Sequence, residues 1–215
     1  MRIDIWSDIV CPWCYVGKRR FERALDTFDD RAAVEVVYRS FQLDPSRPKG
    51  QTHQRREMLM AKYGLSLEQV ETLDGRMEQT AAAEGLEYHL SEDGVTGNTF
   101  DAHRLLQLAG SRGRQDAAVE RLFRAYFTEG RSVFEPEALT PLAVEAGLDE
   151  AEVREVLAGD AYADAVAADM REARALGVNG VPFFVIDRRF GVSGAQATEV
   201  FAQTLARARS HRAAS

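Results

Sequence analysis

The residues of this chain with the clearest chemistry are two cysteines, which stand three positions apart in Cys11-Pro12-Trp13-Cys14. No other cysteine occurs among the 215 residues. At this spacing on the first turn of a helix, the two sulfur atoms can reach each other without a large movement of the backbone. We therefore interpret the pair as a dithiol/disulfide couple in which Cys11 attacks and Cys14 resolves.

A helix that begins at these cysteines would activate the first of them. Pro12 predicts such a beginning, because proline at the first helical position gives up no hydrogen bond and its φ angle already suits the helix. Cys11 would then lie where free N–H groups and the helix dipole favour a thiolate, the form that attacks a disulfide. Trp13 would add a flat apolar surface beside the sulfur atoms.

The composition is that of an ordinary globular protein and argues against several kinds of partner. The chain is 45% hydrophobic and 28% charged, which suits a folded domain with a core. The net charge of −7 leaves no basic excess to neutralise the phosphates of a nucleic acid. No apolar run approaches the roughly 20 residues of a membrane helix, and the first residues do not form a signal-peptide pattern. We expect a cytoplasmic protein without a nucleic-acid or membrane partner.

A cytoplasmic cysteine pair is seldom a structural disulfide, so redox chemistry and metal binding are the two interpretations to weigh. A structural zinc site normally combines two spaced pairs of ligands. The remaining ligands would have to be histidines, and none of these stands at metal-ligand spacing from another: His53, His89, His103 and His211. We expect no metal, and thiol exchange itself requires no organic cofactor.

The expected secondary structure places the cysteines between a strand and a helix. The elements predicted towards the two ends of the chain are a strand at 2–7, a helix at 13–28, strands at 34–38, 182–187 and 190–194, and a helix at 195–208. The middle is almost entirely helical, with helices predicted at 54–63, 66–84, 99–111, 116–129, 136–146, 150–158 and 161–176. A loop is predicted at 93–98, and a frayed tail after 208.

This order is β-α-β, a helical block, then β-β-α. A Cys-x-x-Cys after the first strand of such a unit is the thioredoxin-like pattern. We expect an α/β thioredoxin-like fold with a large all-helical insertion. The expected domains are a thioredoxin-like domain formed by residues 1–51 and 178–215, and a helical insertion domain formed by residues 52–177.

Val181-Pro182 stands just before the first of the two C-terminal strands. A proline that opens a strand needs no special explanation, because that position requires no ladder donor. In thioredoxin-like folds, however, a cis-proline at this place faces the disulfide, and we therefore predict that Pro182 is cis. A cis bond would turn the backbone of Val181 outward, so that its N–H and C=O can pair with an extended substrate. Pro12, Trp13, Val181 and Pro182 are thus the predicted substrate-binding residues near the cysteines.

Four motifs, in order along nearly the whole chain, resemble the FrnE-like branch of the DsbA family. They are Ser-Asp-Ile-Val-Cys-Pro-Trp-Cys-Tyr-Val-Gly at 7–17, Asn-Thr-Phe-Asp-Ala-His-Arg at 98–104, Gly-Val-Asn-Gly-Val-Pro-Phe-Phe-Val-Ile at 177–186 and Val-Ser-Gly-Ala-Gln at 192–196. The resemblance implies a thioredoxin-like fold with a helical insertion and disulfide oxidoreductase or isomerase activity. It also implies that Asn98 and His103 line a cleft over the redox pair. The alternative is that Asn98 or Thr99 caps a helix and that His103 is an ordinary helical residue.

Two other residues near the cysteines have two interpretations each. Asp8 is expected to make backbone hydrogen bonds in its loop, and the alternative is that it accepts the proton of Cys14. Lys18 lies one helical turn after Cys14 and is expected to be solvated, although it could also affect the proton of that cysteine.

The leading interpretation is a cytoplasmic thiol:disulfide oxidoreductase or isomerase that acts on protein or small-molecule thiols and disulfides, with a glutathione-like thiol as reductant. The first alternative is a glutathione-dependent transferase or isomerase of small aromatic substrates. The family's relatives with that chemistry, 2-hydroxychromene-2-carboxylate isomerases and kappa-class glutathione transferases, usually have serine where this chain has Cys11, which favours redox exchange here. The second alternative is a non-catalytic redox sensor. A homodimer is compatible with the resemblance, because relatives with glutathione activity are often dimers.

Overall fold

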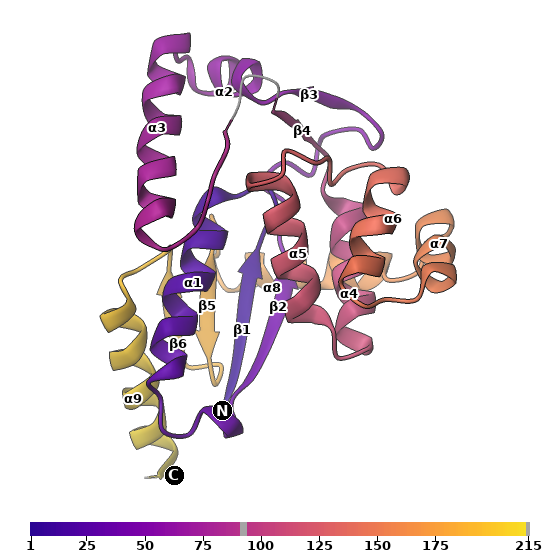
Figure 1. Cartoon of the computed structure of the whole chain (residues 1–215). Helices are drawn as coiled ribbons and strands as arrows, with labels where there is room; N and C mark the ends of the chain where they lie inside the picture. The colour runs from indigo at the N-terminus through magenta and orange to yellow at the C-terminus, as the bar shows by residue number, and fades with distance from the viewer. Residues whose placement is uncertain (91–93, 214–215) are drawn as a thin grey trace. The chain divides into compact units, whose positions relative to one another are not determined.

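The computed structural model describes residues 1–90 and 94–213, and its elements follow the predicted order (Figure 1). In chain order they are β1 (Arg2–Ser7), α1 (Pro12–Asp26), a 3-10 turn (Arg31–Ala33), β2 (Glu35–Ser40), β3 (Thr52–Gln54), α2 (Arg55–Tyr63), α3 (Leu67–Ala83), β4 (Val95–Gly97), α4 (Phe100–Ser111), α5 (Gln115–Phe127), α6 (Pro136–Glu145), α7 (Glu150–Ala158), α8 (Ala163–Ala175), β5 (Phe183–Ile186), β6 (Phe190–Ser193) and α9 (Thr198–Ala213). The last helix therefore continues through most of the predicted tail. The chain forms two compact units, Met1–Leu43 with Ala167–Ser215 and Asp44–Val166.

The first unit is built on a four-stranded sheet with the order β2-β1-β5-β6. β1 pairs with β2 in parallel, and β5 is antiparallel to both β1 and β6. This is the mixed sheet expected when a β-α-β segment and a β-β-α segment share one core, and it confirms the predicted fold class. Because paired residues point to the same face of a sheet, the Trp6–Phe183 pair and the Ile5–Phe184 pair lie on opposite faces.

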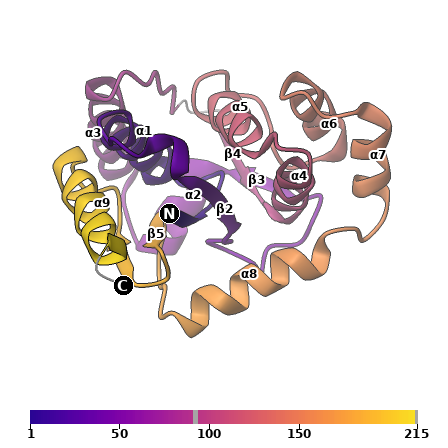
Figure 2. The same cartoon turned by 90° about the horizontal axis from the view of Figure 1, so that it is seen from below.

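Helices α1 and α9 pack together on one face of this sheet (Figure 2). Their contact with the sheet is aromatic: the ring of Phe184 lies 5.4 Å from that of Phe21 in α1 and 4.6 Å from that of Phe201 in α9. All three side chains are fully buried. Burial of such rings contributes about 1.5–3 kcal/mol each, so this cluster holds α1 firmly against β5.

The C-terminal part of α8 packs on the other face of the sheet (Figure 2). Trp6 is buried there with Ala173, Val178 and Val185, and its indole N–H donates to the Asp169 carbonyl over 3.0 Å. These contacts place the residues from Ala167 onward in the first unit, although the sequence led us to expect the insertion to continue to residue 177. At the other boundary the first unit ends at Leu43 rather than at residue 51.

The second unit contains a short antiparallel pair of strands that the sequence did not indicate. β3 pairs with β4, and Thr52 stands opposite Gly97. The sequence instead predicted the start of a helix at residue 54 and a loop at 93–98, of which Asp93 lies outside the described residues. Each strand has three residues and β3 is exposed, so neither shows the alternation by which strands are detected.

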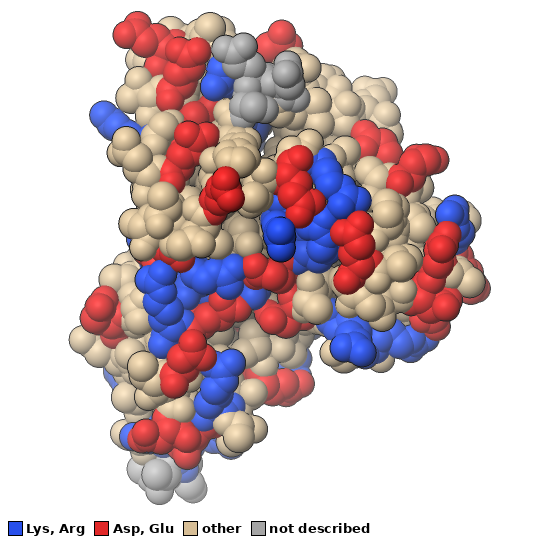
Figure 3. All heavy atoms as spheres, viewed as in Figure 1, with Lys and Arg blue, Asp and Glu red and all other residues tan. Residues whose placement is uncertain are grey.

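The helices of the second unit agree closely with the prediction. Ser66 and Gln69 form the expected capping box at the start of α3. Charged residues pair across neighbouring segments: the Arg121 guanidinium lies between the carboxylates of Glu129 and Glu145, and Arg131 pairs with both. Blue and red side chains are accordingly interspersed over the face shown in Figure 3. Within the described part of the chain, no helix is both long enough and apolar enough to cross a membrane.

Candidate active site

The first cysteine stands at the beginning of α1, as predicted. Cys11 is the N-cap residue in an extended conformation, and Pro12 occupies the first turn. The Cys11 N–H donates to the Asp8 carbonyl over 3.1 Å, and the Cys14 N–H donates to the Cys11 carbonyl over 3.0 Å. Both cysteines are free thiols with little exposure, 5% for Cys11 and 2% for Cys14. The helix start therefore holds a reduced pair at the end of β1.

Cys14 holds its proton more strongly than an ordinary thiol does. Burial is the main reason why the pKa of Cys14 lies well above its ordinary value of 9.0, and a hydrogen bond to Cys11 together with the charge of that residue raises it further. The Ser7 hydroxyl and the Asp8 backbone N–H hydrogen-bond to the Cys14 sulfur and lower this pKa in part. Cys14 is consequently a thiol at neutral pH, which suits the resolving role better than the attacking one.

The loop before β5 brings the backbone of Val181 to the first cysteine. The Val181–Pro182 bond is cis, as predicted. The Cys11 thiol donates to the Val181 carbonyl over 3.4 Å, within the range of a sulfur hydrogen bond. Trp13, between the two cysteines, is 46% exposed and offers its indole at the surface of the unit. The structure thus brings together in one unit six of the predicted site residues: Cys11, Pro12, Trp13, Cys14, Val181 and Pro182.

Asn98 and His103 belong to the second unit, so their predicted place beside the cysteines stays a prediction. The Asn98 carboxamide oxygen accepts the Phe100 N–H over 2.8 Å at the start of α4, and its amino group donates to the Arg47 carbonyl over 2.5 Å. Asn98 therefore serves as a cap, while Thr99 makes no side-chain capping bond. His103 is buried within α4.

Asp8 makes the contacts that we expected, whereas Lys18 does not. The Asp8 carboxylate accepts the Leu43 N–H over 2.8 Å, so this residue does make backbone hydrogen bonds in its loop. The prediction of a solvated Lys18 is wrong, because its side chain is only 2% exposed. Its ammonium group pairs with Glu22 one turn later, and an opposite charge at this spacing compensates in part for the loss of water.

Two residues at the site were not predicted to have a role of their own. Ser7, the last residue of β1, contacts the Cys14 thiol. Gly17 lies inside α1 and packs against Pro182. Glycine is a poor residue for a helix interior, so Gly17 could have been noticed as a place where another segment comes close.

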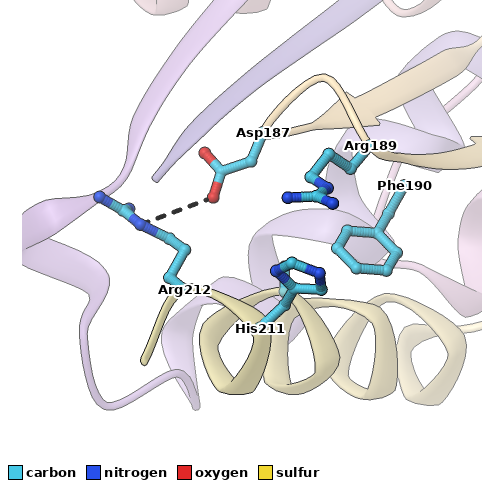
Figure 4. Close-up of a pocket in the computed structure, with 6 residues that line it drawn as sticks. Asp187, Arg189, Phe190, His211 and Arg212 are labelled. Carbon is cyan, nitrogen blue, oxygen red and sulfur yellow. Dashed lines mark ion pairs between the residues drawn. The ribbon is translucent and has the colours of Figure 1, made fainter. Parts of the chain in front are cut away.

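A separate hollow of about 420 Å³ lies in the first unit at the turn between β5 and β6 (Figure 4). It is lined by Asp187, Arg189, Phe190, Ala208, His211 and Arg212. Arg212 Nε lies 3.7 Å from a carboxylate oxygen of Asp187. The Asp187 N–H donates to the carbonyl of Arg2, at the start of β1, whereas the cysteines follow the end of that strand. This hollow is therefore distinct from the site of the cysteine pair. Nor do the described residues include a group of three or more acidic, histidine or cysteine side chains placed to hold a metal ion.

Comparisons with known proteins agree with this geometry. Residues 2–206 match the family model of the DSBA-like thioredoxin domain. The crystal structure of the probable DsbA oxidoreductase SCO1869 from Streptomyces coelicolor is 56% identical, superposes with a TM-score of 0.94, and is matched over 98% of this chain and 90% of that one. The uncharacterized protein YwbO of Bacillus subtilis (strain 168) is 27% identical over 206 residues, which are 95% of this chain and 96% of YwbO.

A more distant structure has the same fold. The cytosolic disulfide reductase DsbM from Pseudomonas aeruginosa with GSH is 18% identical, with a TM-score of 0.63 over 100% of this chain and 98% of DsbM. The family model covers nearly the whole sequence, including the cysteine pair, Val181 and Pro182. The chain therefore belongs to the DSBA-like thioredoxin domain family.

Proposed function

We propose that this protein is a cytoplasmic thiol:disulfide oxidoreductase, with isomerase capacity, whose reacting group is the Cys11–Cys14 pair beside Pro182. The enzyme class, a DsbA-like disulfide oxidoreductase, follows from membership of the family. The proposal adds the reacting residues, the docking residues, the substrates and the location.

The observation that carries the proposal is the position of the Cys11 thiol at the helix N-cap, 3.4 Å from the Val181 carbonyl. At a helix N-terminus, free N–H groups and the dipole favour a negatively charged sulfur. A backbone carbonyl beside that sulfur gives an extended peptide a partner for its N–H. A disulfide within such a peptide would be held next to the nucleophile.

The proposed reaction has two exchange steps. The Cys11 thiolate attacks one sulfur of the substrate disulfide, a Cys11–substrate disulfide forms, and the other substrate sulfur leaves as a thiolate. Cys14 then loses its proton and attacks the Cys11 sulfur, which releases the second substrate thiol and leaves a Cys11–Cys14 disulfide. The substrate gains two electrons and the pair loses two. In the reverse direction the pair oxidises a dithiol.

The protonation of Cys14 supports this order of attack. Its raised pKa keeps it a thiol at neutral pH, so it does not compete with Cys11 for the substrate. The same property delays the second step until the proton has left. A longer-lived mixed disulfide gives a protein substrate time to exchange its own disulfides, which is the basis of the proposed isomerase capacity.

Reduction of the Cys11–Cys14 disulfide needs an external thiol. We propose a glutathione-like thiol, which would form a mixed disulfide with Cys11 and be displaced by a second thiol molecule. DsbM, a cytosolic protein of the same fold, has a structure with GSH. Glutathione is for this reason the first reductant to test, and the cytoplasm, where reduced thiols are abundant, is the proposed location.

The test is the reduction of insulin disulfides by glutathione with wild-type protein, Cys11→Ser and Cys14→Ser. Cys11→Ser removes the nucleophile, and its rate should fall to that of glutathione alone. Cys14→Ser keeps the first step but not the second, and a Cys11–substrate adduct should accumulate and be detected by mass spectrometry. A Cys11→Ser protein as fast as the wild type would disprove the proposal. Weak insulin reduction by the wild type together with tight binding to immobilised glutathione would favour the transferase or isomerase alternative.

A further inference from the structure

Gly17, in the interior of α1, lies against the loop that carries Pro182. A Cβ atom built on Gly17 would lie 2.9 Å from Pro182 Cγ and 3.3 Å from Ala195 Cβ. Real Cβ atoms essentially never approach another atom to less than 3.0 Å. Glycine weakens a helix interior relative to alanine. The close approach of two other segments therefore explains why this position lacks a side chain.

The turn after β6, which also contacts Gly17, is held by two hydrogen bonds. The Gly194 N–H donates to the Pro182 carbonyl over 2.8 Å, and the Arg20 guanidinium donates to the Ala195 carbonyl over 2.7 Å. The turn after β6 is therefore bonded both to Pro182 and to the helix that contains Gly17. Pro182 is thus fixed between this turn and the bare backbone of α1.

The helix and the loop meet again at the reacting atom. Cys11 caps the same helix, and its sulfur lies 3.4 Å from the carbonyl of Val181, the residue next to Pro182. A helix is stiff over the seven residues from Cys11 to Gly17. The depth at which the Pro182 ring rests on Gly17 consequently sets where the Val181 backbone lies relative to the sulfur.

We propose that Gly17 is a positioning residue of the redox site, which acts through Pro182 to hold the Val181 backbone where a peptide disulfide can dock beside Cys11. This inference rests on the proposed function. A methyl group at residue 17 would push the Pro182 ring outward and displace Val181 with it. Substrates that pair with the Val181 backbone would lose affinity, whereas a small disulfide without a peptide backbone would still reach the Cys11 sulfur.

The test compares Gly17→Ala with Gly75→Ala on two disulfides. Gly75 is a matched control, because it lies in the interior of α3 and a Cβ built on it meets no heavy atom within 4 Å beyond its chain neighbours and the backbone of its own helix. The substrates are a short peptide closed by a disulfide and bis(2-hydroxyethyl) disulfide, both reduced with glutathione. Gly17→Ala should lower kcat/KM for the peptide about tenfold, chiefly through a higher KM, and change that for the small disulfide by less than about twofold. Gly75→Ala should change neither.

A second variant covers the case in which Gly17→Ala does not fold, as judged by its thermal unfolding transition. Arg20→Met removes the bond to the Ala195 carbonyl without adding a clash at residue 17, and it should show the same selectivity with a loss of about threefold on the peptide. An unchanged KM for the peptide, or an equal loss on both disulfides, in the folded variants would overturn the positioning role. A wild-type protein that reduces neither disulfide would overturn the proposed function itself, so the two failures are distinguishable.

Discussion

In the first unit, the buried polar groups nearest the cysteines, Ser7 and the backbone of Asp8, hydrogen-bond to a sulfur atom. In the second unit, the buried side chain of Arg104 instead donates to backbone carbonyls around the end of α7. Its acceptors are the carbonyls of Val156, Gly159 and Ala161 and the carboxylate of Asp101. The contacts of Ser7 and Asp8 act on the Cys14 thiol, which can lose a proton. The contacts of Arg104 instead satisfy backbone carbonyls that the end of a helix leaves without partners.

The loss of a hydrogen bond should therefore have different consequences at the two places. A hydrogen bond to a thiol changes the free energy of its ionisation, which appears in rates and in pH dependence. Hydrogen bonds to the end of a helix have no reacting group to act on, so their loss appears in the free energy of unfolding. Substitution of Ser7, which hydrogen-bonds to the Cys14 sulfur, should therefore change chemistry, whereas substitution of Arg104 should change stability.

The largest effect on stability should follow from Arg104→Met, which leaves the carbonyls of Val156, Gly159 and Ala161 without this donor. We expect the free energy of unfolding to fall by about 3 kcal/mol, measured by urea denaturation. Arg124→Met is the matched control, because Arg124 is exposed in α5 and forms a surface ion pair with Glu129. Its effect on the free energy of unfolding should stay within about 0.5 kcal/mol. Similar losses in the two variants would contradict the assigned role of Arg104.

The pH dependence of stability should report the Cys14 thiol. Its pKa in the folded protein lies well above the ordinary value of 9.0 that it regains on unfolding. Above about pH 9 the unfolded chain loses this proton while the folded protein keeps it, so the unfolded state binds fewer protons and stability falls as pH rises. The contribution is fully present below that pH and declines by at most about 1.4 kcal/mol per pH unit above it.

Urea unfolding of the reduced protein between about pH 8 and pH 10.5 would measure this decline. Cys14→Ser has no thiol to titrate at this position and should lose less stability over the same range. Parallel pH curves for the wild type and Cys14→Ser would show that Cys14 does not couple folding to pH, and the distinction between the two units would lose its main support.

The smallest effect on stability should come from Ser7→Ala, which removes one donor from the Cys14 sulfur. The free energy of unfolding should change by less than about 1 kcal/mol. The pKa of Cys14 should rise further, so the second exchange step should slow about threefold at neutral pH. Quenched-flow detection of the mixed disulfide would measure this step. A large loss of stability with an unchanged resolution rate would place Ser7 with Arg104 rather than with the redox site.

Local patterns in the sequence were sufficient to predict those parts of the site that depend on local conformation. Pro12 marked the helix start at Cys11, and the pattern of strands and helices predicted the order of elements and the thioredoxin-like fold. The cis geometry at Pro182 followed once the cysteine pair had indicated a thioredoxin-like fold.

The features that were missed or wrongly predicted depend on contacts between distant segments. Gly17 has a special environment only because residues 182 and 195 come to rest on it. The β3–β4 pair joins strands that lie some forty residues apart and are too short to show a period. The burial of Lys18, and the inclusion of residues 167–177 in the first unit, are set by packing that a helical pattern does not encode.

The two tryptophans of the chain differ in a way that has a practical consequence. Trp6 is enclosed in the apolar cluster under the sheet, with its indole N–H bonded to a carbonyl, whereas Trp13 is half open to solvent between the cysteines. An aqueous quencher such as iodide reaches one indole and not the other. The accessible part of the intrinsic fluorescence therefore comes from Trp13, so quenching by iodide would follow the surroundings of the two cysteines without any label.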